Sequence, residues 1–216
     1  MHDATDFRNY VIPKPWGHEY IIFENNFLSI WYLFIKSGAS TSLHCHPKKK
    51  TGLVVLEGTA RFHLIERDFE LQSNQKVMIR PGSFHKTENR TNQNLHIIEV
   101  ETPKDKENLV RISDLYGRQN KAYESETLKR TNEFFIPNDS FLKLEFLNNS
   151  FEIVSNLITL NPNDSDLLVV LSPTLFKHHD HDLCPVGEIL SGKTFKKLAI
   201  DYTIAKNAQI LKICHL

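Results

Sequence analysis

Apolar and polar residues alternate over short runs along this chain, and turn-forming residues separate the runs. Alternation with a period of two is typical of β-strands, whereas a sustained helical period is nearly absent. Glycine and proline between the runs, as at Gly38, Gly58 and Pro81, predict tight turns. Strands are predicted in the first half at 20–24, 28–36, 43–46, 53–56, 60–65, 77–80, 85–89 and 95–101. Short strands joined by tight turns indicate an all-β fold of the sandwich or jelly-roll type.

The second half repeats this pattern in a degraded form. Its apolar runs 153–160, 166–171 and 208–213 resemble the runs 28–35, 51–56 and 94–100 in that order. Gly192 takes the place of Gly82, but Phe195 stands where a histidine follows in the first half. The stretch 160–168 is too short for a counterpart of strand 43–46. We therefore expect two domains, 1–118 and 119–216, the second a degenerate jelly roll.

A polar, charged segment at 103–120 separates the two halves and is interpreted as a connector with one short helix near 108–115. The whole chain has 26 basic and 26 acidic residues, which gives no field that would favour nucleic acid or an anionic membrane. Cys45, Cys184 and Cys214 show no disulfide-like pattern, which favours a reducing compartment. Residues 1–6 do not resemble a secretory signal, and no apolar run approaches the roughly 20 residues of a membrane helix. A soluble, cytoplasmic protein is expected.

Three histidines carry the clearest candidate chemistry. His44 and His46 are two positions apart, so their side chains lie on one face of a strand. His85 comes 39 residues after His46, behind the turn at Pro81-Gly82. Imidazoles that converge inside a small barrel would bind a divalent metal ion. Otherwise they are core or surface histidines, and Cys45 between them should face the opposite way and pack.

The residues around these histidines resemble a known superfamily. The segment Gly38-(five residues)-His44-Cys45-His46-(four residues)-Thr51-(six residues)-Gly58 has the spacing of the first cupin motif. The segment Pro81-Gly82-Ser83-Phe84-His85-(three residues)-Asn89 is similar to the second. Within the cupins, the flanking residues resemble the type II mannose-6-phosphate isomerase domain, which is often fused to a mannose-1-phosphate guanylyltransferase. They lie at 14–17, 42–43, 54–60, 97–100 and 110–118. The resemblance covers about residues 13–118 and implies a bicupin whose second barrel lacks metal ligands.

The chain departs from this family at the metal ligands. The family's metal-binding glutamate falls on Thr51, and its usual glutamine falls on His44. A divalent ion held by three neutral imidazoles keeps its full double charge, so it should polarise oxygen ligands strongly and attract an anion. It also keeps an open coordination position, as in catalytic sites. We expect zinc, with iron, manganese or nickel as alternatives, and a water-orienting or substrate-binding role for Thr51.

The resemblance implies isomerase-like chemistry on a sugar or sugar phosphate in the synthesis of surface polysaccharides. Glu99 would be the catalytic base, although an ion pair with Lys14 or Arg111 would explain it equally. Arg118 would bind a phosphate through its planar guanidinium group, unless it is an exposed charge at a strand end. Lys49 would bind the same anion, unless it belongs to a solvated loop.

Two other functions remain open at this point. Three imidazoles in a cupin also suit iron(II) and dioxygen chemistry. A cupin without the glutamate could instead bind carbohydrate without turnover. The run His178-His179-Asp180-His181-Asp182 is interpreted as a solvated loop, with adventitious metal capture as the alternative. The apolar run 28–35 favours a homodimer, since an uncovered apolar sheet face would be an aggregation liability.

Overall fold

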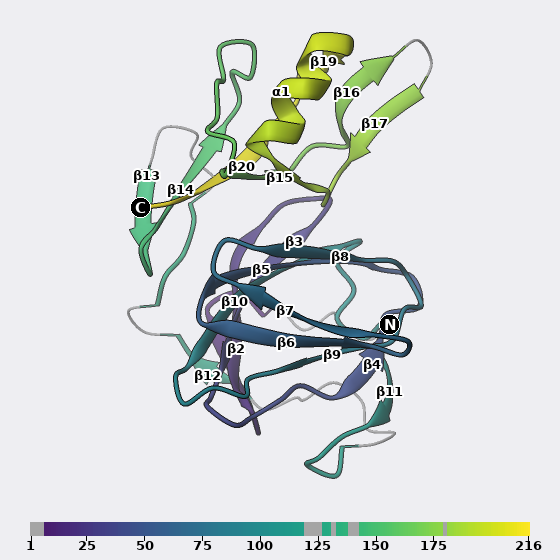
Figure 1. Cartoon of the computed structure of the whole chain (residues 1–216), viewed down its shortest axis with the longest axis vertical. Helices are drawn as coiled ribbons and strands as arrows, with labels where there is room; N and C mark the ends of the chain where they lie inside the picture. Colours follow the sequence, from purple (N-terminus) through teal and green to yellow (C-terminus); the bar gives the residue numbers. More distant parts are fainter. Residues whose placement is uncertain (1–6, 119–126, 131–132, 138–142, 179–180) are drawn as a thin grey trace.

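The structure of the chain is a computed structural model that describes residues 7–118, 127–130, 133–137, 143–178 and 181–216. Nearly all of its regular structure is β-strand, and one short helix lies in these ranges (Figure 1). In Figure 1 the first half forms the lower barrel, and the second half lies above it as a smaller β-rich layer. Among the described residues, no helix has the length and apolar character that crossing a membrane requires.

Two antiparallel sheets build the barrel of the first half. The larger sheet has the order β12-β1-β2-β3-β10-β5-β8. Its strands are β1 (Tyr10–Lys14), β2 (Gly17–Glu24), β3 (Ser29–Ile35), β5 (Lys50–Glu57), β8 (Lys76–Ile79), β10 (Leu95–Thr102) and β12 (Leu128–Lys129). The smaller sheet has the order β11-β4-β9-β6-β7. Its strands are β4 (Leu43–Cys45), β6 (Thr59–Leu64), β7 (Asp68–Gln72), β9 (His85–Glu88) and β11 (Val110–Ser113).

Side-chain alternation divides each strand between the barrel interior and the outside. On β3, Trp31, Leu33 and Ile35 belong to the core inside the barrel, whereas Ile30 and Tyr32 belong to a second apolar cluster on the opposite face. This is the period-two arrangement that β-strands impose. Both faces of the larger sheet are therefore buried, which explains why this run is apolar at nearly every position.

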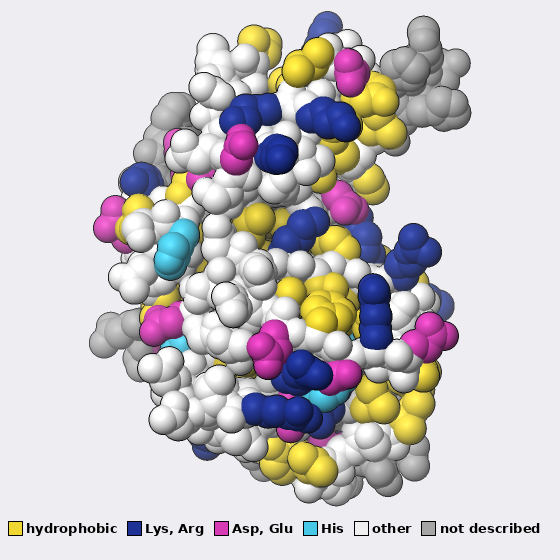
Figure 2. Space-filling view, in the orientation of Figure 1, with side chains coloured by type: hydrophobic (Ala, Val, Ile, Leu, Met, Phe, Trp, Pro, Cys, Tyr) yellow, Lys and Arg dark blue, Asp and Glu magenta, His cyan; other side chains and the backbone are white. Residues whose placement is uncertain are grey.

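The outward face of the smaller sheet is charged. His63 on β6 lies 2.8 Å from Glu88 on β9, and Arg90 approaches the same carboxylate at 3.0 Å. Figure 2 shows basic and acidic side chains around a histidine over this part of the first half. The inward neighbours on the same strands, such as Phe62 and Thr87, are buried. The contrast between the two faces fixes the register of this sheet.

The eight strands predicted in the first half are all present, whereas the helix predicted near 108–115 is wrong. That segment contains β11, which pairs with β4. Val110 and Ile112 alternate with polar neighbours, and this period of two agrees with a strand at the sheet edge. The segment is thus part of the barrel, because β11 joins the sheet that contains the histidines.

The second half contains two smaller sheets and the helix. The strands of the first are β13 (Lys143–Phe146), β14 (Asn149–Val154), β20 (Ile210–His215), β15 (Leu167–Val170) and β18 (Ile189–Ser191), in that order. Those of the second are β17 (His181–Pro185), β16 (Thr174–His178) and β19 (Thr203–Ile204), again in sheet order. The helix α1 (Gly192–Asp201) begins after Ser191, whose hydroxyl accepts a hydrogen bond from the Thr194 N–H.

The strand order of the second half matches that of the first. The order β14-β20-β15-β18 corresponds to β3-β10-β5-β8, and β19-β16-β17 corresponds to β9-β6-β7. The turns before β8 and β18 also agree: the N–H of Asn74 bonds to the Val55 carbonyl, and that of Gly187 bonds to the Val170 carbonyl. Asn74 and Gly187 have φ values of 63° and 77°. These correspondences are what the predicted repeat requires, and the degenerate second jelly roll stays a prediction.

The two halves share one apolar core. Side chains on the outer face of the larger sheet, including Ile30, Tyr32 and Val100, are buried against side chains of the second half, including Phe151 and Leu211. The apolar outer face on which the predicted homodimer depended is therefore covered within the chain itself. A homodimer stays a prediction, and this face gives it no support.

Candidate metal centre

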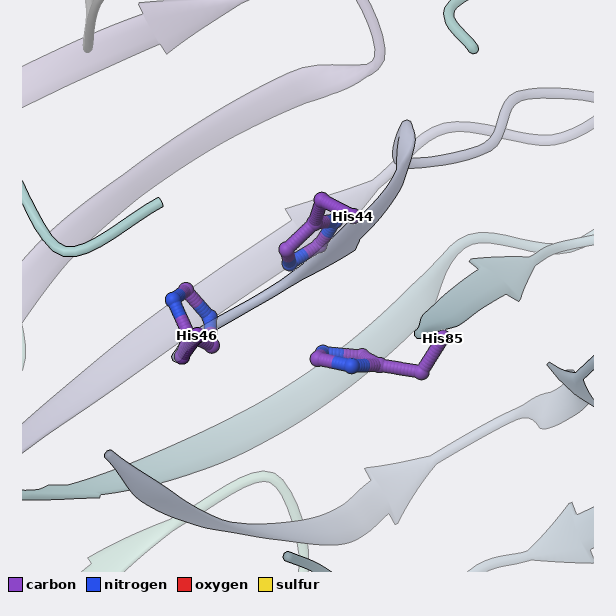
Figure 3. A group of neighbouring side chains, drawn as sticks. All are labelled: His44, His46 and His85. Carbon is purple, nitrogen blue, oxygen red and sulfur yellow. The ribbon is translucent and has the colours of Figure 1, made fainter. Parts of the chain in front are cut away.

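Two neighbouring strands of the smaller sheet bring the three predicted histidines together. On β4 and β9, His44 and His85 are direct cross-strand partners. His46 follows β4 by one residue and returns to the same side of the chain. The ring centroid of His44 lies 5.0 Å from that of His46 and 4.4 Å from that of His85. Figure 3 shows the three rings directed toward one another inside the barrel.

Main-chain carbonyl groups fix the orientation of all three rings. The Nδ1 atoms lie at hydrogen-bonding distance from carbonyl oxygens, at 2.9 Å in His44 (Ser42), 2.7 Å in His46 (Asn108) and 3.0 Å in His85 (Ser83). Each Nδ1 must therefore carry the proton, which leaves a lone pair on Nε2. The Nε2 atoms of His46 and His85 are buried and have no hydrogen-bond partner. Such an arrangement is typical of histidines that bind a metal through Nε2.

Burial keeps these imidazoles neutral. It lowers the pKa of His46 to about 3 and that of His85 to about 4, and the pKa of His44 falls well below its ordinary value. Neutral imidazole is the form that binds metal ions. Ligand atoms of the three residues all lie within 4.8 Å of one another. The three residues therefore fit a divalent ion, and nitrogen ligands suit zinc, iron, nickel or copper.

Thr51 and Glu101 lie side by side on two neighbouring strands next to the three histidines. Thr51 on β5 is the cross-strand partner of Glu101 on β10, and both are buried. Leu53 and Ile97, which are two and four positions away on the same strands, belong to the barrel core. Thr51 and Glu101 therefore also face the barrel interior. Ligand atoms of His46, Glu99 and Glu101 form a second group within 4.8 Å.

A buried ionic cluster adjoins the histidines. Lys49 Nζ lies 2.7 Å from Glu101 Oε1, and Lys106 Nζ lies 3.5 Å from the same oxygen. Lys106 also approaches Glu19 at 3.3 Å and Glu99 at 3.7 Å, with its ammonium group 3.8 Å from the centroid of the Trp31 ring. Such mutual pairing is what allows several charges to remain inside a barrel.

The solvated loop predicted for Lys49 is wrong. Its side chain is fully buried, because it extends into the barrel to reach Glu101 rather than toward solvent. Lys50 pairs with Glu188 of the second half at 3.1 Å, and only Lys48 of this run is exposed. The phosphate-binding role of Lys49 stays a prediction, but its ammonium group already has an anionic partner.

Glu99, the predicted base, lines the cavity beside the histidines. Among the described residues its ion-pair partner is Lys106, not Lys14 or Arg111 as the sequence suggested. Burial, and then the nearby Glu101 carboxylate, raise the pKa of Glu99 to about 7. A carboxyl group with such a pKa can both accept and release a proton near neutral pH.

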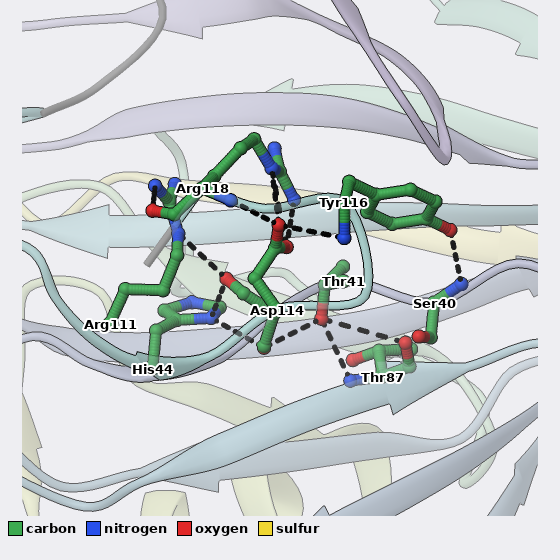
Figure 4. Close-up of polar contacts among 9 residues, drawn as sticks. Ser40, Thr41, His44, Thr87, Arg111, Asp114, Tyr116 and Arg118 are labelled. Atoms are coloured by element: carbon green, nitrogen blue, oxygen red, sulfur yellow. Dashed lines mark hydrogen bonds and ion pairs between the residues drawn. The ribbon is translucent and has the colours of Figure 1, made fainter. Parts of the chain in front are cut away.

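Arg118 is buried and lines the same cavity, so the alternative of an exposed charge at a strand end is wrong. Its guanidinium group pairs with Asp114 at 2.7 Å, and its main-chain carbonyl accepts a hydrogen bond from Arg111. Arg111 in turn donates to the Ser42 hydroxyl, which lies beside His44. Figure 4 shows this chain of contacts from Asp114 to His44. The segment 103–118 is therefore part of the site rather than only a connector.

Two important residues of the site were not identified from the sequence. Glu101 has the same parity as Glu99 on one strand, so strict alternation would have placed both carboxylates in the barrel. Lys106 lies in the polar segment before β11, where no periodic pattern indicates its direction. Only the tertiary fold shows that its ammonium group lies among three carboxylates.

The histidine-rich run of the second half is not a simple loop. His178 ends β16 and His181 begins β17, and the two are cross-strand partners in a hairpin. The predicted absence of strand structure is thus wrong at both ends of the run, because its flanking residues pair. Residues 179 and 180 lie outside the described residues. Metal capture by this run stays untested.

Parts of two bacterial proteins are similar to this chain. The alginate biosynthesis protein AlgA of Pseudomonas putida is 29% identical over 123 residues, which cover 56% of this chain and 25% of AlgA. A mannose-1-phosphate guanylyltransferase of Klebsiella pneumoniae is 26% identical over 113 residues, which cover 51% of this chain and 24% of that protein. The chain thus spans about a quarter of the length of these relatives.

Solved structures with double-stranded β-helix folds also match. One from Klebsiella pneumoniae is 17% identical with a TM-score of 0.43, over 53% of this chain and all of that chain. A cupin-superfamily sugar phosphate isomerase from Silicibacter pomeroyi is 15% identical with a TM-score of 0.38, over 40% of this chain and 59% of that chain. The family described as mannose-6-phosphate isomerase C-terminal matches residues 3–114. Because this match covers more than half of the chain, the chain belongs to the mannose-6-phosphate isomerase C-terminal family.

Proposed function

We propose that this chain binds one divalent ion through His44, His46 and His85 and acts on a sugar phosphate in the manner of an isomerase, during surface polysaccharide synthesis. The observation that carries the proposal is the pair of buried, unpartnered Nε2 atoms of His46 and His85. The cavity beside them also contains lysine and arginine side chains, which suit an anionic substrate. Relatives named for alginate biosynthesis and mannose-1-phosphate guanylyl transfer support this substrate class. Zinc is the favoured ion, and a cytoplasmic location is expected.

The residues that line the cavity would have the following roles in the reaction. A bound divalent ion would polarise a carbonyl or hydroxyl oxygen of the sugar. Arg111 and Arg118 would hold the phosphate through their planar guanidinium groups. The Glu99 carboxylate would take a proton from one sugar carbon and return it to the neighbouring carbon, while the proton of the sugar hydroxyl passes to the former carbonyl oxygen. Trp16 and Leu53 line the same cavity and would exclude water from the reacting carbons.

The second half has no counterpart of β4 among its described strands, and we propose that it is a degenerate jelly roll without a metal site of its own. The matching strand order of the two halves supports this origin. Its place against the larger sheet gives it a structural role, because it buries the outer face of the barrel that contains the histidines.

Metal analysis combined with NMR on a panel of sugar phosphates tests the proposal. The protein should carry about one divalent ion per chain, and His46→Ala or His85→Ala should abolish it. In D2O, turnover should interconvert an aldose phosphate and a ketose phosphate and replace the transferred hydrogen with deuterium. Glu99→Gln should keep the metal and lose turnover. Absence of metal from the purified protein, or its retention in both histidine variants, would refute the metal centre.

The same experiment separates the other two functions. Oxygen uptake with iron but not with zinc, without sugar turnover, would favour a three-histidine dioxygenase. Tight binding of a sugar phosphate without turnover, whichever metal is restored, would favour a carbohydrate-binding cupin. Either result would replace the isomerase proposal while leaving the metal centre in place.

A further inference from the structure

Among the residues that the structure describes, four buried polar atoms without hydrogen-bond partners lie inside the barrel. They are Nε2 of His46, Nε2 of His85, Oγ1 of Thr51 and Oε2 of Glu101. Buried polar atoms in folded proteins nearly always have a partner, so a local group of exceptions needs a physical reason. The histidine nitrogens are explained by the metal centre. The free oxygen of Glu101 is not explained by three histidine ligands.

The two oxygens of Glu101 have different surroundings. Oε1 lies 2.7 Å from the ammonium group of Lys49 and 3.5 Å from that of Lys106. Oε2 has no donor, although the residue is only 1% exposed. An ionised carboxylate is costly to bury with one oxygen bare. The lysines fix one oxygen and leave the other available for a cation.

His46 lies close to the Glu101 carboxylate. One ring nitrogen of His46 and one carboxylate oxygen of Glu101 lie within 4.8 Å of each other. The Nδ1 atom of His46 already bonds to the Asn108 carbonyl, so its available electron pair is on Nε2. A lone pair on nitrogen and an ionised carboxylate so close together repel each other unless a cation lies between them.

On the basis of the metal-binding function above, we propose that Glu101 supplies a carboxylate ligand to the ion held by His44, His46 and His85. The carboxylate would thus come from β10 instead of from Thr51, its cross-strand partner on β5. Glu101 forms its compact group with His46 and Glu99, and not with all three histidines. Its side chain therefore moves toward the ion on binding, while Lys49 retains Oε1. The ion then carries less than the full double charge expected for three imidazoles alone.

Metal affinity and the absorption spectrum of bound Co²⁺ test this ligand directly. Zn²⁺ affinity is measured by competition with a chelator in the full chain. Glu101→Gln should weaken Zn²⁺ binding by at least about 10- to 100-fold, the range for residues that only support a ligand. It should also change the Co²⁺ spectrum. Glu99→Gln is the matched control, two positions along the same strand and in the same compact group. Neither of its oxygens is a buried atom without a partner, so this variant should leave the Co²⁺ spectrum unchanged and weaken Zn²⁺ binding less than Glu101→Gln does.

Glu101→Gln leaves Lys49 buried without a partner, so this variant is at risk of folding poorly. Two further variants keep the test decisive in that case. In Lys49→Met, Glu101→Gln both charges are removed, and the loss of Zn²⁺ affinity should persist. In Thr51→Glu, Glu101→Gln the carboxylate returns on the opposite strand, and affinity should recover. Circular dichroism confirms folding in each case.

The outcomes distinguish this ligand from the metal centre itself. If Glu101→Gln, or the double variant with Lys49→Met, binds Zn²⁺ and Co²⁺ as the unaltered chain does while His46→Ala does not, Glu101 is not a ligand and the histidine centre stands. If the unaltered chain binds neither ion, the ligand and the proposed function both fail.

Discussion

Replacement of Phe151 by alanine should destabilise both halves of the chain together. Phe151 lies on β14 in the second half, is 1% exposed, and packs in the core that the second half shares with the larger sheet. Its ring centroid lies 5.0 Å from that of Phe134. Truncation of a buried phenylalanine to alanine costs about 3–5 kcal/mol. With about 2–4 °C lost per kcal/mol for a chain of this length, Tm should fall by about 6–20 °C.

Tryptophan fluorescence makes this measurement specific to the first half. The chain has two tryptophans, Trp16 and Trp31, and both are buried in the core of the first barrel. A change in the second half alters their unfolding transition only if the two halves unfold as one cooperative unit. We therefore expect the fluorescence transition of Phe151→Ala to shift as far as the far-ultraviolet circular dichroism transition.

The matched control is Ile200→Ala, which truncates a side chain on α1 that is 83% exposed. Both transitions should then stay within about 0.5 kcal/mol of those of the unaltered chain. A fluorescence transition that does not move in Phe151→Ala, while the circular dichroism transition does, would refute the shared core. It would show instead that each half unfolds independently.

Three other changes have defined consequences for stability. Lys106→Met removes the cation shared by three buried carboxylates and should cost about 3–5 kcal/mol in urea unfolding; adding Glu99→Gln should restore a large part of it. Burial lowers the pKa of His18 and of His96, so the unfolded chain binds protons that the folded chain does not. Stability of the metal-free protein should therefore fall as pH drops below about 6.5. Replacing both histidines with glutamine should make this dependence less steep without removing it, because the pKa values of His44, His46 and His85 are also lowered. Gly192→Ala places a Cβ 1.9 Å from a backbone carbonyl oxygen and should lower Tm, as differential scanning calorimetry can measure.

Local pattern was sufficient to predict eight strands of the first half and the histidine triad, although it missed β1, β7 and β11. Alternation reports which face of a strand is buried, and a spacing of two residues is enough to place His44 and His46 side by side. The position of His85 required only a turn and one neighbouring strand. These are short-range consequences of strand geometry, and the structure reproduces them.

Interactions between distant segments could not be predicted in this way. Lys49 belongs to a run of lysines that reads as solvated, yet it is buried because a carboxylate 52 residues away needs a partner. The strand β11 was mistaken for a helix because its pairing with β4 is a tertiary contact. The helix α1 was missed, although Ser191 followed by Thr194 is a local capping signal that could have indicated its start.

The cover on the outer face of the barrel has a consequence for how the protein behaves on dilution. In an oligomer, protection of such a face depends on the concentration of free subunits and is lost when the subunits separate. Here the covering strands belong to the same chain, so they act at a fixed effective concentration set by the tether. The barrel that contains the histidines thus keeps its apolar face buried even at low abundance, when an intermolecular cover would dissociate.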